Sequence, residues 1–169
     1  YIDYLNKEIS QYISNIIVHE TNEKDSTAIS AYFKITGNIE RIGDHAADIA
    51  EIIPHLVTVR KEGDPAVSQA IAMGKKAHQM ILDALDALTA EDENAARRVI
   101  AADDAVDYDF NAIKHQLAQE IAEDPGKVDA ALDLLMVIKY LERIGDHAVN
   151  VAEWVQFVRT GRYKDESMF

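Results

Sequence analysis

Acidic side chains recur at four-residue intervals in two segments of this chain. The first row is Glu40, Asp44 and Asp48, and the second is Glu142 and Asp146, with Asn150 in the third place. Positions four apart lie on one face of a helix, so each row would set its carboxylates side by side. Like charges at this spacing repel by roughly 0.2–0.5 kcal/mol per pair, which makes a row of one sign a candidate cation site. The ordinary alternative is a solvated outer face.

More acids stand in the segments that precede the two rows. Asp103 and Asp107, again four apart, precede the second row, and Asp3 precedes the first. Antiparallel helices in contact would bring Asp103 and Asp107 beside Glu142 and Asp146. Four carboxylates that converge without a cation would each have to be protonated or paired. An all-oxygen cluster suits hard cations such as iron(III), magnesium, manganese or calcium.

Both rows belong to a segment that occurs twice. Residues 40–51, ERIGDHAADIAE, return as residues 142–153, ERIGDHAVNVAE, an offset of 102 (142 − 40). Helical periodicity alone does not require an identical string of seven residues, so we interpret the chain as two copies of one structural unit. Each copy has a glycine in mid-helix, Gly43 and Gly145, at a cost of about 1 kcal/mol relative to alanine. This cost indicates close packing against another helix.

Two further pairs of residues in the doubled segment have polar side chains. Arg41 and Arg143 are expected to pair with acids on the next helix, with anion binding as the alternative. His45 and His147 follow the second acid of each row and lie about 100° around the helix from it. We therefore expect the histidines between helices or at a helix edge rather than among metal ligands.

Apolar residues at intervals of three and four place these segments on helices, and no stretch alternates as a strand does. Helices are predicted over about 2–19, 26–59, 65–88, 92–122 and 128–158, with a cap at Thr89 and a kink or end at Pro54. The fold class is all-α: two tandem three-helix bundles of up-down helices, with the first helix of the first bundle absent. Residues 1–62 form the incomplete first repeat of two helices, and residues 63–169 form the second repeat of three.

Composition narrows the class of protein. The chain has 169 residues, no cysteine and a formal net charge of −13. Absence of cysteine excludes disulfides and thiolate metal sites and is compatible with the cytoplasm. So acidic a surface repels phosphate backbones, which argues against nucleic acid as a partner. We find no apolar run near the length of a membrane span.

The doubled motif Glu-Arg-Ile-Gly-Asp-His-Ala-x-[Asn/Asp]-[Ile/Val]-Ala-Glu resembles the PhoU family of phosphate-uptake regulators over nearly the whole chain. The resemblance implies a cytoplasmic protein that is not an enzyme. Such proteins are negative regulators, which lower phosphate uptake and phosphate-starvation signalling when phosphate is plentiful. They act through a phosphate transporter subunit and a sensor histidine kinase, so contact with the membrane would be peripheral. A homo-oligomer is compatible with this role.

Some members of the family bind iron or other metals through paired Glu/Asp-x-x-x-Asp motifs. These motifs correspond here to Glu40 and Asp44, Asp103 and Asp107, and Glu142 and Asp146, with Asp3 as the one acid of the first partner motif. The resemblance thus implies a metal ion bound by carboxylates: iron, or else magnesium, manganese or zinc.

Three alternatives stay open at this point. Residues 2–41 also resemble the PhoU-like cytoplasmic domain of bacterial sodium/phosphate cotransporters, although Trp154 and Gly161 are more similar to the free-standing regulator. A ferritin-like di-iron bundle would use Glu-x-x-His, and no glutamate here has a histidine three residues on. A metal-free scaffold would present the acidic rows to a basic partner.

Overall fold

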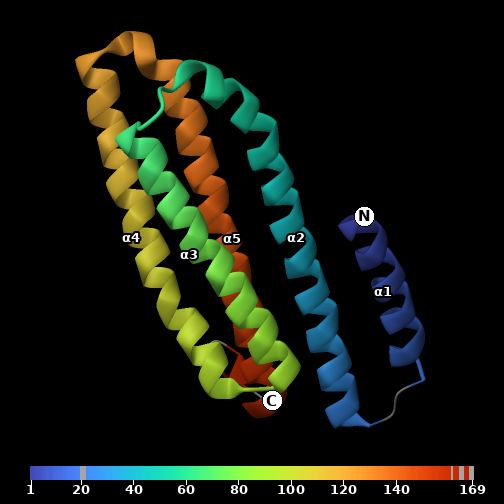
Figure 1. The fold of residues 1–169 in the computed structure, drawn as a ribbon. Helices are drawn as coiled ribbons and strands as arrows, with labels where there is room; N and C mark the ends of the chain where they lie inside the picture. Colours follow the sequence, from blue (N-terminus) through green and yellow to red (C-terminus); the bar gives the residue numbers. More distant parts are fainter. Residues whose placement is uncertain (20–21, 161, 164–165, 168–169) are drawn as a thin grey trace.

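The computed structural model describes residues 1–19, 22–160, 162–163 and 166–167. Helices make up nearly all of it (Figure 1): α1 Ile2–Ile17, α2 Glu23–Val59, α3 Pro65–Ala90, α4 Glu93–Glu123, the 3-10 turn η1 Pro125–Lys127, and α5 Val128–Thr160. The expected all-α fold, with two helices in the first half and three in the second, is confirmed. The exception is a two-residue antiparallel ladder between β1 Arg162–Tyr163 and β2 Glu166–Ser167. No helix in the described ranges is long and apolar enough to cross a membrane.

Aspartate side chains cap the N-terminal ends of α3 and α4. Asp64 accepts hydrogen bonds from two backbone N–H groups in the first turn of α3, at 2.8 and 3.2 Å, and Pro65 opens that helix. Asp92 caps α4 in the same way. The cap predicted at Thr89 is wrong, because Thr89 lies inside α3 and its hydroxyl donates to the carbonyl of Leu85 at 2.8 Å.

The long helix α2 does not end at Pro54, where the sequence indicated a kink or an end. It continues to Val59, and its last turns curve toward the start of α3 (Figure 1). Pro54 cannot donate to the carbonyl of Ala50, four residues before it. Both residues are exposed, so water can bond that carbonyl instead.

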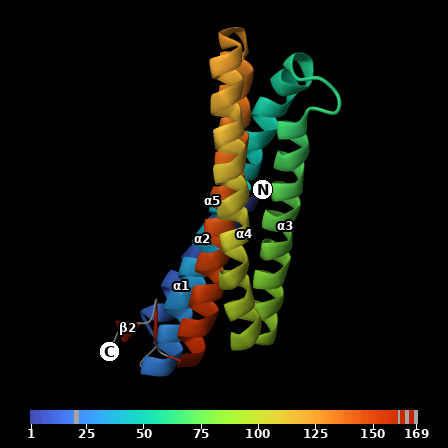
Figure 2. The same cartoon turned by 90° about the vertical axis from the view of Figure 1, so that its left-hand side faces the viewer.

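The central helix of the structure is α5. It lies against α2, α3 and α4, whereas α1 lies only against α2 within the described ranges (Figure 1). Figure 2 shows α2 running obliquely to α4 and α5. One cluster of buried side chains spans α2 to α5, including Ile35, Leu56, Met73, Val99, Ile113, Leu134, Ile138 and Val151. The two halves therefore share a core, and their division into units 1–62 and 63–169 stays a prediction.

The two motif glycines mark where neighbouring helices approach closely. A Cβ atom on Gly145 would lie 3.1 Å from Asp103 Oδ1 and 3.6 Å from Val106 Cγ1, both on α4. A Cβ atom on Gly43 would lie 2.8 Å from Ile2 Cδ1 on α1. Val106 directly precedes Asp107, as Ile2 directly precedes Asp3. The contact of α1 with α2 therefore repeats the contact of α4 with α5, and the expected close packing at both glycines is confirmed.

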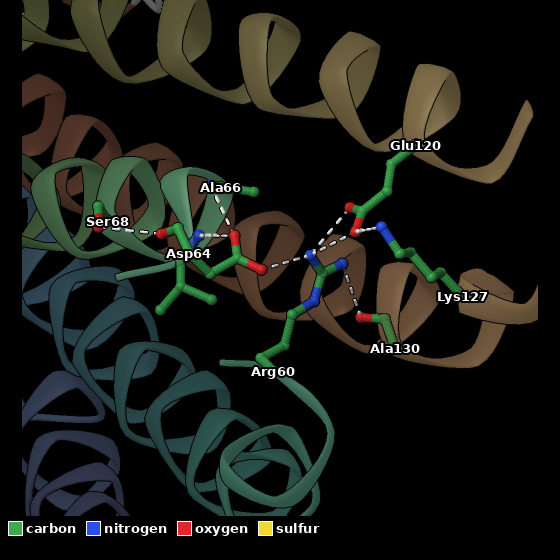
Figure 3. Close-up of polar contacts among 8 residues, drawn as sticks. Arg60, Asp64, Ala66, Ser68, Glu120, Lys127 and Ala130 are labelled. Atoms are coloured by element: carbon green, nitrogen blue, oxygen red, sulfur yellow. Dashed lines mark hydrogen bonds and ion pairs between the residues drawn. The ribbon is translucent and has the colours of Figure 1, made fainter. Parts of the chain in front are cut away.

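The salt-bridged Arg60 joins the ends of four helices (Figure 3). Its side chain is 5% exposed, and Nη1 donates to Asp64 Oδ2 at 3.0 Å and to Glu120 Oε2 at 2.9 Å. Nη2 donates to the carbonyl of Ala130 at 3.3 Å. These partners stand at the start of α3, the end of α4 and the start of α5. Burial raises the pKa of Asp64, but the Arg60 hydrogen bond and backbone N–H groups outweigh burial and leave that pKa lowered.

Alanine substitutions at glycines in equivalent helical settings should separate helix propensity from helix packing. No atom would lie within 4 Å of a Cβ on Gly37, so Gly37→Ala should raise the free energy of unfolding by about 1 kcal/mol. Gly145→Ala should lower it, because the new methyl group would press on Asp103 and on Val106, which is fully buried. Urea unfolding followed by circular dichroism measures both. Equal stabilisation by the two substitutions would contradict the close approach of α4 and α5.

Removal of the Arg60 guanidinium should destabilise the protein strongly. Breaking a fully buried ion pair costs about 3–5 kcal/mol, and the Asp64 and Glu120 side chains retain 16% and 21% exposure, so we expect about 2–3 kcal/mol for Arg60→Met. The control is Arg97→Met, since the Arg97 side chain is 67% exposed and its pair with Glu93 should be worth under about 1 kcal/mol. A loss for Arg60→Met no larger than that for Arg97→Met would show that the four-helix junction contributes little.

Candidate metal centre

Four acidic side chains face one another across the boundary of α4 and α5. Asp103 and Asp107 come from α4, and Glu142 and Asp146 come from α5. Burial, as the largest cause, and the charges of Asp107, Asp146 and Glu142 together raise the pKa of Asp103 to about 6. Packing against Gly145 leaves Asp103 Oδ1 buried without a hydrogen-bond partner among the described residues. The predicted second row and its partner motif therefore do converge.

The two acids on α5 have cations from their own helix. Lys139 Nζ lies 2.5 Å from Glu142 Oε2, and Arg143 Nη1 lies 3.3 Å from Asp146 Oδ2. Burial raises the pKa of Asp146 and Glu142 adds to the rise, while Arg143 and Lys139 oppose it. The first copy repeats the arginine contact, with Arg41 Nη1 at 3.4 Å from Asp44 Oδ2. The expectation that these arginines pair with the next helix is wrong, since a spacing of three residues puts an acid within reach on the same helix.

The four carboxylates suit a hard cation in donor type and in charge. Within the described residues, however, no three acidic or histidine side chains are arranged so that they could hold a metal ion. Asp107 is exposed, so it is free to adopt other rotamers at little cost, whereas Glu142 is held by its ion pair with Lys139. Asp103 is different, because its Oδ1 is buried without a partner and an unpaired buried oxygen is costly. A cation at this boundary would satisfy that oxygen.

The first row occupies a matching position but is less enclosed. Glu40 and Asp44 are half-buried on α2, and Asp3 is exposed on α1. Because Ile2 packs on Gly43 as Val106 packs on Gly145, Asp3 stands where Asp107 stands in the second half. The position that would match Asp103 falls outside the sequence. Of the seven predicted metal ligands, Asp107, Glu142 and Asp146 have charges that act on Asp103.

The two motif histidines meet where α2 crosses α5, which confirms their expected place between helices. The rings of His45 and His147 stack with centroids 5.6 Å apart, and His45 also stacks on Tyr140 at 5.5 Å. His147 Nδ1 lies 2.9 Å from Asn38 Oδ1, which also accepts from Asn150 Nδ2 at 3.1 Å. Burial lowers the pKa of His147, and His45 lowers it further. The two copies are therefore packed with their histidines face to face.

Sequence reasoning missed this polar contact and the role of Lys139. A signal for the first was available, because both histidines lie in the identical seven-residue string and a duplicated unit often packs on its own copy. For Lys139 the signal was its position one turn before Glu142.

Neutralising Asp103 should stabilise the metal-free protein at neutral pH. Native Asp103 takes up a proton near pH 6 and the unfolded chain does so near 3.8, so between these values the native state binds more protons and the free energy of unfolding falls as pH rises. The difference corresponds to at most about 3 kcal/mol, and solvent at this half-buried position reduces the gain expected for Asp103→Asn to about 1–2 kcal/mol. Urea unfolding at about pH 7.5 and about pH 4 measures it, and the gain should vanish at the lower pH.

The matched control is Asp86→Asn, an exposed acid on α3. It should leave the free energy of unfolding unchanged at both pH values. An Asp103→Asn variant that is no more stable than the wild type at neutral pH would show that the ionised Asp103 carboxylate does not destabilise the protein.

Comparison with known proteins identifies the family. The family model described as PhoU domain matches residues 1–53 and 71–155. A phosphate-specific transport system accessory protein PhoU homolog from Clostridium acetobutylicum is 37% identical over 97% of this chain and 75% of its own length. The homolog of the same name from Caulobacter vibrioides is 36% identical over 95% of this chain and 70% of its own length. That from Zymomonas mobilis is 34% identical over 84% of this chain, which spans 59% of that relative.

Two solved structures have the same fold. The crystal structure of PhoU from Pseudomonas aeruginosa superposes with a TM-score of 0.90 at 28% identity, covering 95% of this chain and 77% of that one. The phosphate transport system regulatory protein PhoU from Streptococcus pneumoniae superposes with a TM-score of 0.83 at 23% identity, which shows the fold alone. The doubled acidic motif, the paired helical units and these matches together show that the chain belongs to the PhoU family.

Proposed function

We propose that this chain is a metal-binding regulator of phosphate transport. The relatives are named as accessory proteins of the phosphate-specific transport system, which supports a regulatory role in phosphate transport and supports a free-standing regulator over a cotransporter domain. Membership of the family also argues against a ferritin-like store. The observation that carries the metal part is Asp103 Oδ1, buried without a partner among three other carboxylates.

The residues that would hold the cation are Asp103, Asp107, Glu142 and Asp146. A bound cation would supply positive charge that offsets their mutual repulsion and their burial. The cluster joins α4 to α5, so its charge state affects how tightly these two helices associate. We propose no catalytic step, since the likeness is to accessory proteins and the cluster has a structural means of affecting a partner.

The proposed partners are a phosphate transporter subunit and a sensor histidine kinase on the cytoplasmic side of the membrane. A net charge of −13 favours a basic surface on either partner. Negative regulation would then follow from contact that depends on the cation. A scaffold without metal is the second candidate, because the acidic rows alone would attract a basic partner.

Loss of two central carboxylates should weaken metal binding. We expect Asp103→Ala combined with Glu142→Ala to lower Mn²⁺ affinity at least about 10-fold, since the variant removes ligands rather than second-sphere groups. Isothermal titration and elemental analysis of the purified protein measure the change. Because charge removal at Asp103 relieves repulsion, the variant should stay folded, which circular dichroism checks.

The control removes two exposed acids from α3, Asp83→Ala with Asp86→Ala, and should leave Mn²⁺ affinity unchanged. Equal metal content in both double variants would refute the assignment of the site. If this chain captures a transporter subunit, and added salt weakens the capture while a chelator leaves it unchanged, the metal-free scaffold would be supported instead.

A further inference from the structure

Lys139 reaches the carboxylate cluster from within the cluster's own helix. Its Nζ lies 2.5 Å from Glu142 Oε2, and the Glu142 side chain is only 15% exposed. The same ammonium lies 5.2 Å from the centroid of the Phe110 ring on α4. Lys139 therefore touches both helices that form the boundary, and its positive charge stands where a bound cation would be drawn.

Both acids of the cluster on α5 have a cation on their own helix. Lys139 pairs with Glu142, and Arg143 pairs with Asp146. Asp103 on α4 has no cation of this kind, and its Oδ1 lacks a partner within the described residues. The compensation of charge is thus one-sided. Lys139 and Arg143 pair with the acids of the cluster on α5, and neither pairs with an acid on α4.

The first copy lacks this lysine. Lys139 corresponds to Gly37 under the offset of 102 residues that relates the motifs (139 − 102). The arginine contact is present in both copies, as Arg41 with Asp44 and Arg143 with Asp146. Within the described residues Glu40, the counterpart of Glu142, makes no ion pair. Lys139 is consequently a cation beside the second cluster that has no counterpart in the first copy.

A lysine can leave such a site easily. Its ammonium is a compact charge on a flexible stem, unlike the planar fork of arginine. The Phe110 ring already lies 5.2 Å from the ammonium and would still attract it after Glu142 is released, since a cation over an aromatic face gains roughly 0.5–1 kcal/mol at exposed sites. After release from Glu142 the ammonium would therefore keep a favourable contact with the Phe110 ring.

We propose that Lys139 is a tethered cation that occupies the second carboxylate cluster in the absence of metal and competes with a divalent ion for Glu142. This inference rests on the proposed metal binding and deepens it. Metal entry would require Lys139 to move off Glu142, so the lysine lowers the affinity of the second cluster. It also keeps the metal-free cluster from carrying its full negative charge.

The test compares Mn²⁺ binding by the 169-residue chain and three variants in isothermal titration. Lys139→Met removes the charge and keeps the length of the side chain, and it should tighten Mn²⁺ binding about 3- to 10-fold, because a partly exposed ion pair no longer has to be broken. Lys139→Arg keeps the charge and should bind Mn²⁺ no more tightly than the wild type does. Lys114→Met is the matched control, since Lys114 Nζ also lies 5.2 Å from the Phe110 centroid but bonds Asn111 instead.

The possible results separate this inference from the proposed function. Tighter binding by Lys139→Met alone supports the tethered cation, and so does binding by Lys139→Met where the wild type shows none. Wild-type binding that Lys139→Met leaves equal or weakens overturns the role of Lys139 and leaves metal binding standing. Tightening by Lys114→Met to the same degree overturns it too, because general charge then explains the effect. No binding by any folded variant overturns both proposals.

Discussion

The close approach of α4 and α5 at Gly145 is the constraint on which the rest of the site depends. Without a side chain at Gly145, the Asp103 carboxylate can settle between the two helices, where its Oδ1 is buried and unpaired. The charges of three more carboxylates act on it, and its burial leaves their repulsion only partly screened. Their repulsion must be relieved by a proton, by a cation from the protein or by a cation from solution. The raised pKa of Asp103 and the lysine on Glu142 are the first two of these solutions, and the metal binding that we propose would be the third.

The doubled motif gives the two halves of the molecule several equivalent contacts, although the halves also differ in charge. The glycine contact, the helix pairing and the arginine contact recur in both halves. Lys139 does not recur, because the equivalent position in the first copy is Gly37. The copies are not independent, because α2 and α5 meet through the stacked rings of His45 and His147. This polar contact lies inside a shared apolar core. The same sequence string therefore serves two purposes, one face of it joining the copies and another carrying the acids.

Helix existence and the acid positions were predictable from sequence because both depend on local spacing. Stripes at three and four residues located five helices, and the four-residue interval located the carboxylates that converge. What escaped prediction depends on tertiary geometry. Arg60 bonds partners 4, 60 and 70 residues away, and no local pattern announces such a junction. The stacking of the two histidines could be predicted only by knowing how α2 crosses α5. The arginine partners were misassigned because a same-helix acid at three residues competes well with one on a neighbouring helix.

The sparse attachment of α1 has a consequence for the first copy. Among its described side chains only Ile13 is buried, while Ile2, Leu5 and Ile9 are 37–42% exposed, so α1 can detach from α2 with little apolar surface lost. Its amide hydrogens should then exchange through local opening, well before those of α5. Asp3 travels with α1, so a cation shared between Asp3 and Glu40 would spend part of its binding energy on holding the helix down. If the proposed cation binds, its affinity for the first copy would therefore depend on the docking of α1, whereas its affinity for the second would depend on displacement of Lys139.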